Sequence, residues 1–261
     1  MRKLHYVYDM RLDFSEPVLK HEYTLKCFPQ SDSMQQISAV TIRIQPRGKQ
    51  FTSSDSFGNK TICGVAENRH RRFEVRTEGY AVTGMDAKRP AVYSSLGKFR
   101  YASSLTKSGP GLLEYAALNP FSGGNLKTAY FYMESINRDM MYAPGITCVD
   151  TTAEQAILNR QGVCQDYAHI LLALLRMKRI PARYVCGMME GEGASHAWVE
   201  VEEDGFWYGF DPTNGRTVDD NYIFVSSGRD AFDCQINKGS LRGGGSQRQS
   251  VSVIVTDEQP A

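Results

Sequence analysis

Three motifs decide the fold: GVCQDYAHILLALLR at residues 162–176, SHAWVEV at 195–201 and GFDPTNG at 209–215. They supply Cys164, His196 and Asp211, in that order. A thiol, an imidazole and a carboxylate are the parts of a nucleophilic triad, in which the imidazole takes the thiol proton and the carboxylate orients the imidazole. Each of the three residues falls at the start or end of a predicted element, where a side chain can be both exposed and held in place.

Cys164 opens an apolar segment. Residues 167–175 carry apolar side chains on nearly every face, which predicts a buried helix, and Gly162 before it is expected to supply the turn. An isolated cysteine is most often a buried structural thiol. A cysteine in a first helical turn instead faces unpaired amides and the positive end of the helix dipole, which favour thiolate over thiol. The position of Cys164 therefore predicts a reactive thiol.

The strands that follow bring His196 and Asp211 together. Residues 196–203 alternate apolar and polar side chains, as in a strand with one face in water, and Asp204-Gly205 indicates a hairpin. A two-residue loop would place Asp211 opposite Trp198, one diagonal step from His196, and a four-residue loop would place it opposite His196 itself. Both registers put His196 and Asp211 on one face, whereas an unbulged three-residue loop would separate them.

These motifs, with RIPARYVCG at 179–187, closely resemble the Cys, His and Asp blocks of the transglutaminase-like superfamily, specifically its bacterial transglutaminase-like cysteine proteases. The resemblance spans about residues 105–230. It implies a papain-like α+β core, in which a helix carrying the nucleophile packs on an antiparallel sheet carrying base and acid. It also implies that Cys164 is the nucleophile, His196 the general base and Asp211 the residue that orients His196.

The first hundred residues have a different pattern. From Lys3 to about Tyr101, short alternating segments are separated by turns, which predicts an antiparallel sandwich or barrel. This part is similar to the N-terminal β domain of the same bacterial proteins, including DSFGN at 55–59. We therefore expect an α+β protein with two parts: an N-terminal β-sandwich in residues 1–101, and a transglutaminase-like catalytic core in residues 102–261 that includes the C-terminal strand.

Five further segments can also be predicted. Residues 112–121 and 127–142 have helical spacing, and a short helix before Gly162 is expected to begin with Thr151 as its cap and Glu154 three residues on. The GEGAS stretch at 191–195 is expected to be a loop, and the glycine run at 243–245 a hairpin loop before the last strand.

An oxyanion formed during acyl transfer needs hydrogen-bond donors, and the Cys164 amide is one natural supplier. Relatives of this fold often add a tryptophan or glutamine upstream of the nucleophile, but Trp198 and Trp207 both lie downstream and are expected to be sheet residues. Gln161 and Tyr142 are the remaining candidates.

His169 lies about 140° around the helix from Cys164, so we expect it to pack rather than to act as a base.

Composition narrows the functional classes. Thirty basic and 29 acidic residues leave a formal charge of +1, which argues against a nucleic-acid-binding surface. No apolar run approaches the roughly 20 residues that span a bilayer, and no apolar segment marks a secretory signal, so a cytoplasmic location without membrane contact is expected. The six cysteines form no CxxC pairs, and Asp219–Asn221 is too short for a calcium loop, so no metal or cofactor is expected.

The expected reaction is thiol-dependent acyl transfer at an amide or peptide bond, with a peptide or protein as substrate. Water as acceptor makes the chain a cysteine peptidase or amidase, which is our preferred interpretation, and an amine as acceptor makes it a transglutaminase. A third possibility is a non-catalytic module that binds a peptide or protein on the same fold. The sequence names neither the preferred side chain nor the oligomeric state.

Overall fold

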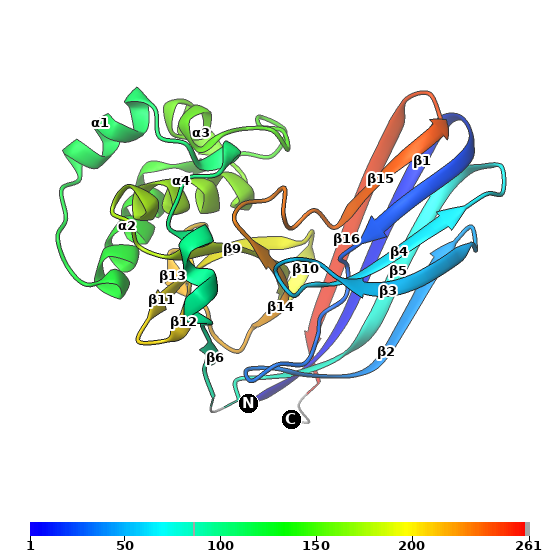
Figure 1. Cartoon of the computed structure of the whole chain (residues 1–261), viewed down its shortest axis with the longest axis horizontal. Helices are drawn as coiled ribbons and strands as arrows, with labels where there is room; N and C mark the ends of the chain where they lie inside the picture. Colours follow the sequence, from blue (N-terminus) through cyan, green and yellow to red (C-terminus); the bar gives the residue numbers. More distant parts are fainter. Residues whose placement is uncertain (86, 259–261) are drawn as a thin grey trace.

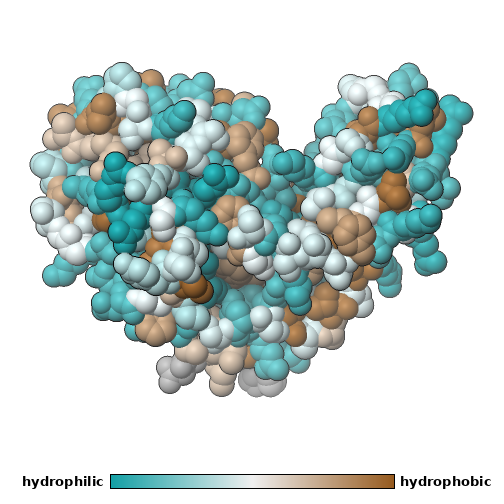
Figure 2. Space-filling model, viewed as in Figure 1, coloured by the Kyte–Doolittle hydropathy of each residue, from teal (hydrophilic) through white to brown (hydrophobic). Residues whose placement is uncertain are grey.

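The structure is a computed structural model that describes residues 1–85 and 87–258. Two lobes face each other in Figure 1, one built of a sheet with helices and the other of a sheet alone. The helices are α1 (Pro110–Leu118), α2 (Asn125–Asp139), α3 (Ala153–Asn159) and α4 (Cys164–Met177), with 3₁₀ turns at Tyr93–Phe99 and Ser104–Thr106. The space-filling view in Figure 2 shows a notch between the two lobes on this face.

The eight-stranded antiparallel sheet forms most of the second lobe. Its strands are β1 (Arg2–Leu25), β2 (Gln36–Gln45), β3 (Lys49–Ser54), β4 (Lys60–Ala66), β5 (His70–Thr83), β10 (Gly191–Gly193), β15 (Asn237–Gly243) and β16 (Gln247–Asp257). The alternating pattern near the N-terminus explains this sheet, because every second side chain from Leu4 to Phe14 is buried.

Two of the expected short strands are one long strand. Only short strands were expected between Lys3 and Tyr101, but β1 runs unbroken from Arg2 to Leu25. Its register shifts near Val18, and its first half pairs with β5 and β16 while its second half pairs with β4 and β15. The Tyr23 and Phe73 rings lie 4.9 Å apart. The strands expected to form a sandwich therefore belong to one curled sheet. Side chains from the first and the second half of β1 pack into the same core.

The C-terminal strands also differ from the expected division. The final strand was assigned to the catalytic part, but β16 pairs with the first half of β1, from Leu4–Asp257 to Phe14–Gln247. The glycine run joins β15 to β16 as expected, and Gly243, Gly244 and Gly245 all have positive φ angles, as a tight hairpin requires. The second lobe is thus built from both ends of the chain. A boundary at residue 101 stays a prediction.

The six-stranded antiparallel sheet carries the helices. It contains β6 (Arg89–Pro90), β9 (Ala182–Met189), β11 (His196–Glu203), β12 (Phe206–Asp211), β13 (Arg216–Thr217) and β14 (Tyr222–Gly228). The buried apolar face of α4 packs on Ala197, Val199 and Val201 of β11, and α2 packs beside it on the same face. This helix-on-sheet layer confirms the expected α+β core.

The opposite face of β11 was expected to lie in water, but the structure buries it. Trp198 is 1% exposed and Glu200 is 4% exposed. The Glu200 carboxylate accepts hydrogen bonds from Arg183 at 2.6 and 2.8 Å and from Arg89 at 2.5 Å. A carboxylate can be buried when it is paired in this way, so the alternating pattern marked two buried faces of different polarity.

A short strand ties the two lobes together close to His196. The GEGAS stretch was expected to be a loop, yet β10 leaves the end of β9 and pairs with β16 before the chain re-enters the six-stranded sheet at His196. Met188 and Ile223 of that sheet share an apolar core with the β1 side chains. The start of β11 is therefore held by both lobes.

The helix that leads to Cys164 begins one residue later than expected. Thr152, not Thr151, caps α3, because its hydroxyl accepts a bond from the Gln155 amide and Gln155 bonds back to the Thr152 amide. Glu154, the expected partner of the cap, accepts instead from the amides of Gly109, Gly111 and Leu112 at the start of α1. One carboxylate thus satisfies the free amides of a neighbouring helix.

No described helix has the length and apolar character needed to cross a membrane.

Candidate active site

Cys164 is the first residue of α4, as expected, and the turn before it is fixed by Asp166. The Asp166 carboxylate accepts a 2.8 Å bond from the Val163 amide, closing the first turn on itself. Gly162 lies in a two-residue strand, β8 (Gln161–Gly162), and not in the turn expected for it. A side chain at 162 would meet the Asp166 carboxylate within 2.5 Å, so glycine is needed there for close approach.

Neither polar neighbour of Cys164 on the helix competes with His196. Asp166 is buried and also accepts a 2.7 Å bond from the Thr147 hydroxyl, and burial raises the pKa of its carboxyl. His169 is fully buried, where its Nε2 accepts from the Ala231 amide at 3.2 Å. Burial lowers the pKa of His169 to about 3. His169 is therefore neutral and has the packing role expected for it.

The β11–β12 hairpin brings His196 to Asp211. Val199 pairs with Phe210 and Glu203 with Phe206, which is the register of a two-residue loop. Asp204 and Gly205 form that loop with φ angles of 51° and 81°, as a turn with two left-handed residues requires. His196 Nε2 lies 2.7 Å from Asp211 Oδ2. The diagonal contact predicted by the first register is thus the observed one.

Asp211 is fully buried at the end of β12 and receives hydrogen bonds on both oxygens. Oδ1 accepts from the amides of Thr213 and Asn214, and Oδ2 accepts from the Asn214 side chain and the Tyr222 hydroxyl, both at 2.7 Å, besides its bond to His196. Burial would raise the pKa of Asp211, but its bond to His196, the charge of His196 and the other donors lower it below its ordinary value. The carboxylate stays charged beneath His196.

His196 contacts both Asp211 and Cys164. Burial acts to lower its pKa, but hydrogen bonds and charge attraction from Asp211 and Cys164 outweigh burial and raise the pKa of His196 to about 10. Because Nε2 is bonded to Asp211, Nδ1 is left to face the thiol. This arrangement can hold an imidazolium beside a thiolate, which is the resting state of an activated cysteine nucleophile.

Tyr222 was not predicted as a site residue. It opens β14, three strands away from β12, and its hydroxyl donates to Asp211 while accepting from Arg216 Nε at 3.0 Å. Its ring meets Trp198 edge-on at 5.4 Å, and Trp198 stacks on His196 at 6.3 Å. Trp198 is a sheet residue, as expected. Gly187 leaves room for the Trp198 ring, since a Cβ atom at position 187 would lie 2.3 Å from that ring. Tyr222 and Trp198 together hold His196 and Asp211 in place.

Replacing Tyr222 with phenylalanine is expected to slow any acyl transfer at Cys164 by about tenfold, because a hydrogen bond to a charged group contributes about 1.5–3 kcal/mol. The substrate KM should stay unchanged. With one donor lost, the pKa of Asp211 rises, so the acidic limb of the pH–rate profile should move to higher pH. Steady-state kinetics between pH 4 and 9 measures both effects.

Tyr115→Phe is the matched control for this variant. The Tyr115 hydroxyl donates to Asp139 Oδ2 at 2.9 Å, so the control also removes a tyrosine–aspartate hydrogen bond, but outside the site. Equal pH profiles for the two variants would show that Tyr222 does not act through Asp211.

Of the two candidates for a side-chain oxyanion donor, Tyr142 lies close to the thiol. Burial, and then the charge of Cys164, raise the pKa of Tyr142, so the phenol keeps its proton. Tyr142 belongs to β7 (Met141–Tyr142), which pairs in parallel with β8 and sets Tyr142 opposite Gly162. Gln161 lies opposite Met141 in the same pair. Tyr142 thus places a protonated phenol near the start of the nucleophile helix.

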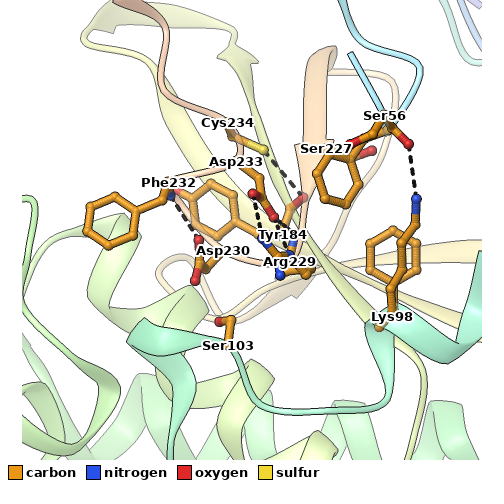
Figure 3. Close-up of polar contacts among 12 residues, drawn as sticks. Ser56, Lys98, Ser103, Tyr184, Ser227, Arg229, Asp230, Phe232, Asp233 and Cys234 are labelled. Atoms are coloured by element: carbon orange, nitrogen blue, oxygen red, sulfur yellow. Dashed lines mark hydrogen bonds and ion pairs between the residues drawn. The ribbon is translucent and has the colours of Figure 1, made fainter. Parts of the chain in front are cut away.

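The other five cysteines are free thiols with different surroundings. Burial raises the pKa of Cys27 and of Cys186 to about 12, and it raises the pKa of Cys234 well above its ordinary value. Figure 3 shows Cys234 donating to the Tyr184 carbonyl in the turn that Arg229 and Asp233 close with an ion pair. Cys148 is exposed and Cys63 half-buried. Cys164 alone among the six lies beside a histidine bonded to a carboxylate.

The acidic stretch 219–221 has a structural role in this chain. The Asp219 carboxylate accepts from the amide and the side chain of Asn221, which closes the turn before β14. Among residues 1–85 and 87–258, no three His, Cys, Asp or Glu side chains are grouped so as to hold a metal ion.

Two family models match the sequence. Residues 122–212 match the model of the transglutaminase-like superfamily, a range that contains Cys164, His196 and Asp211. Residues 4–81 match the bacterial transglutaminase-like N-terminal region, which corresponds to β1 through most of β5. The two matched ranges follow the two similarities expected from the motifs.

Mycobacterial proteins are similar along the chain. An uncharacterised protein of Mycobacterium tuberculosis is 30% identical over 240 residues, covering 78% of this chain and 76% of that protein. An uncharacterised protein of Mycobacterium leprae is 38% identical over 125 residues, so the alignment spans 44% of each protein.

A solved structure shares the fold. A protein of Cytophaga hutchinsonii, named as a candidate cysteine protease, superposes with a TM-score of 0.82 at 20% identity, covering 100% of this chain and 92% of that one. The likeness extends over both lobes, so the joined arrangement of the two sheets is a fold that other proteins also adopt.

Proposed function

The chain belongs to the transglutaminase-like superfamily, and on that premise we propose that it is a thiol enzyme that transfers the acyl group of a peptide or amide bond through Cys164, with His196 as base and Asp211 as the residue that orients His196. The observation that carries the proposal is the chain of contacts from Cys164 to His196 and from His196 to Asp211.

The proposed reaction has two halves. In the first, the Cys164 sulfur bonds to the carbonyl carbon, the carbon–nitrogen bond breaks, and the imidazolium of His196 gives its proton to the departing amine. In the second, neutral His196 takes a proton from the acceptor, the acceptor oxygen or nitrogen bonds to the acyl carbon, and the carbon–sulfur bond breaks. The thiolate is then regenerated beside the protonated imidazole, which is the state in which the cycle began.

The oxyanion that forms in each half needs donors near Cys164. The Cys164 amide at the start of α4 supplies one, because the first amides of a helix have no partner within the helix. The Tyr142 hydroxyl is the proposed second donor, since the phenol lies close to the thiol and stays protonated. In this chain a tyrosine would thus act where relatives of the fold use tryptophan or glutamine.

Hydrolysis is the preferred second half of the reaction. The similar Cytophaga protein is named as a candidate cysteine protease, and the motifs resemble those of bacterial transglutaminase-like cysteine proteases. Transfer to an amine would require the site to exclude water and to hold a second substrate. We therefore propose a peptidase or amidase.

A complex peptide mixture tests the proposal directly. The full chain should produce new peptide termini that carry ¹⁸O when the incubation is run in H₂¹⁸O. Added glycine ethyl ester should leave most products unchanged if water is the acceptor, and it should appear as an amide adduct if an amine is preferred. Binding of peptides without any new product would contradict the proposal and favour a non-catalytic module.

A further inference from the structure

The segment 141–149, MYAPGITCV, is an apolar surface beside the nucleophile. It contains no charged residue, and its four largest apolar side chains, Met141, Tyr142, Ile146 and Val149, are each between 54% and 63% exposed. Apolar side chains gathered at the surface in this way commonly mark a site where a ligand or partner binds. The segment is therefore a candidate binding surface.

Four contacts fasten this segment to the start of α4. The amides of Met141 and Ala143 donate to the carbonyls of Arg160 and Gly162, both at 2.9 Å. The Thr147 hydroxyl donates to Asp166, and the Gln165 side chain donates to the Val149 carbonyl at 3.2 Å. The residues on either side of Cys164 thus hold the segment in place. A surface held in this way loses little conformational freedom when a ligand binds.

The other wall around Cys164 is polar. It contains two exposed side chains next to Asp211: Asn214, in the turn after β12 and bonded to Asp211, and Arg216, in β13 and bonded to Tyr222. His196 must give its proton to the departing amine, so the leaving group lies on this polar side. The acyl part of the substrate then lies toward segment 141–149.

We propose that segment 141–149 binds a bulky apolar side chain in the acyl part of the substrate, so that the chain acts on peptides carrying leucine, isoleucine or phenylalanine on the N-terminal side of the cleaved bond. This inference rests on the proposed function. Ile146 and Val149 supply aliphatic contact, and the Tyr142 ring continues that surface to the thiol. A charged side chain placed there would lose water without gaining a partner, which disfavours it.

Matched peptidyl electrophiles measure the preference. Alkyne-tagged acetyl-Ala-Leu and acetyl-Ala-Glu acyloxymethyl ketones differ only in the side chain beside the reactive carbonyl, and the rate of Cys164 labelling is read for each by peptide mass spectrometry. The leucine probe is expected to label Cys164 at least about tenfold faster, since contact with part of an aliphatic side chain is sufficient for a factor of that size. Iodoacetamide, which has no side chain, serves as the reference reagent.

Ile146→Ser and Val149→Ser, which remove apolar surface without adding charge, should each reduce that ratio toward one, with each probe rate divided by the iodoacetamide rate of the same variant. Both side chains are exposed, so the fold should tolerate the changes. Leu113→Ser on α1, where the side chain is 55% exposed, is the control and should keep the wild-type ratio.

The outcomes separate this inference from the proposed function. Equal rates for the two probes, with iodoacetamide labelling that still depends on His196, would overturn the preference and leave the nucleophile intact. If iodoacetamide labels Cys164 at the same rate with and without His196, both the side-chain preference and the proposed function are wrong. If Ile146→Ser instead converts a dimer into a monomer in sedimentation experiments and leaves the probe ratio unchanged, the segment is a contact between copies and the inference is wrong.

Discussion

The Cys164→Ala variant is expected to lose all acyl transfer while keeping the fold. Removing the nucleophile of a triad enzyme lowers kcat by about 10⁶-fold, which places turnover below detection. Cys164 is only partly buried and is the first residue of α4, and alanine has a high helix propensity, so α4 should form as before. The measurement is the yield of new peptide termini from the peptide mixture, together with circular dichroism and a thermal melt of the variant.

Cys63→Ala is the control for a general effect of removing a thiol. Cys63 is half-buried in β4, in the other lobe, and should be replaceable without loss of turnover. Cys164→Ala should still bind the peptides that wild type cleaves, because binding does not need the thiol. Product formation by Cys164→Ala at the wild-type rate would mean that another group performs the chemistry.

The Asp211→Asn variant should lose about 10⁴-fold in the rate of acyl transfer, because an amide in this place selects the wrong tautomer of the histidine. The asparagine NH₂ would donate to His196 Nε2, which moves the ring proton to Nδ1, where it faces Cys164. His196 could then no longer accept the thiol proton. Turnover of the same peptides, measured across pH, tests this expectation against Asp139→Asn, which removes a carboxylate from the end of α2.

The same substitution should change how stability depends on pH. The pKa of His196 is raised to about 10, above its ordinary value near 6.5, so its contribution to stability is complete below about pH 6.5 and is lost as the pH rises through about 10. Asp211→Asn removes the main partner of the imidazolium, so this loss on raising the pH should be much smaller in the variant. Parallel melting curves from pH 6 to 10 for wild type and variant would contradict the assignment of Asp211 as that partner.

The parts of the site that could be predicted from sequence depend on local geometry. The first turn of α4 is marked by an apolar run that begins just after Cys164. Asp204-Gly205 indicates a hairpin with a two-residue or a four-residue loop, and the structure has the two-residue loop, with positive φ angles at both residues. Asn214 could also have been found, because an aspartate that ends a strand commonly accepts from the amides two and three residues on.

The parts that could not be predicted depend on pairing between distant segments. Tyr222 reaches Asp211 from across the sheet, and no local pattern marks a tyrosine at the start of a strand as a partner of a carboxylate. The pairing of β10 with β16 joins residues 191–193 to residues 253–255. The alternating pattern predicted Glu200 to be at the surface, because such a pattern distinguishes polar from apolar side chains and not exposed from buried ones. Glu200 is buried because it pairs with Arg89 and Arg183 from other strands.

The central claim is that Cys164 and His196 form an activated pair, and the most direct test is the pH dependence of iodoacetamide labelling at Cys164, read by peptide mass spectrometry in wild type and in His196→Ala. Exposed Cys148 serves as the internal reference in both proteins. The account predicts that Cys164 labels rapidly well below the pH of about 8.5 at which an ordinary thiol ionises, and that His196→Ala loses this advantage. Labelling of Cys164 that follows Cys148 at every pH, with or without His196, would contradict it.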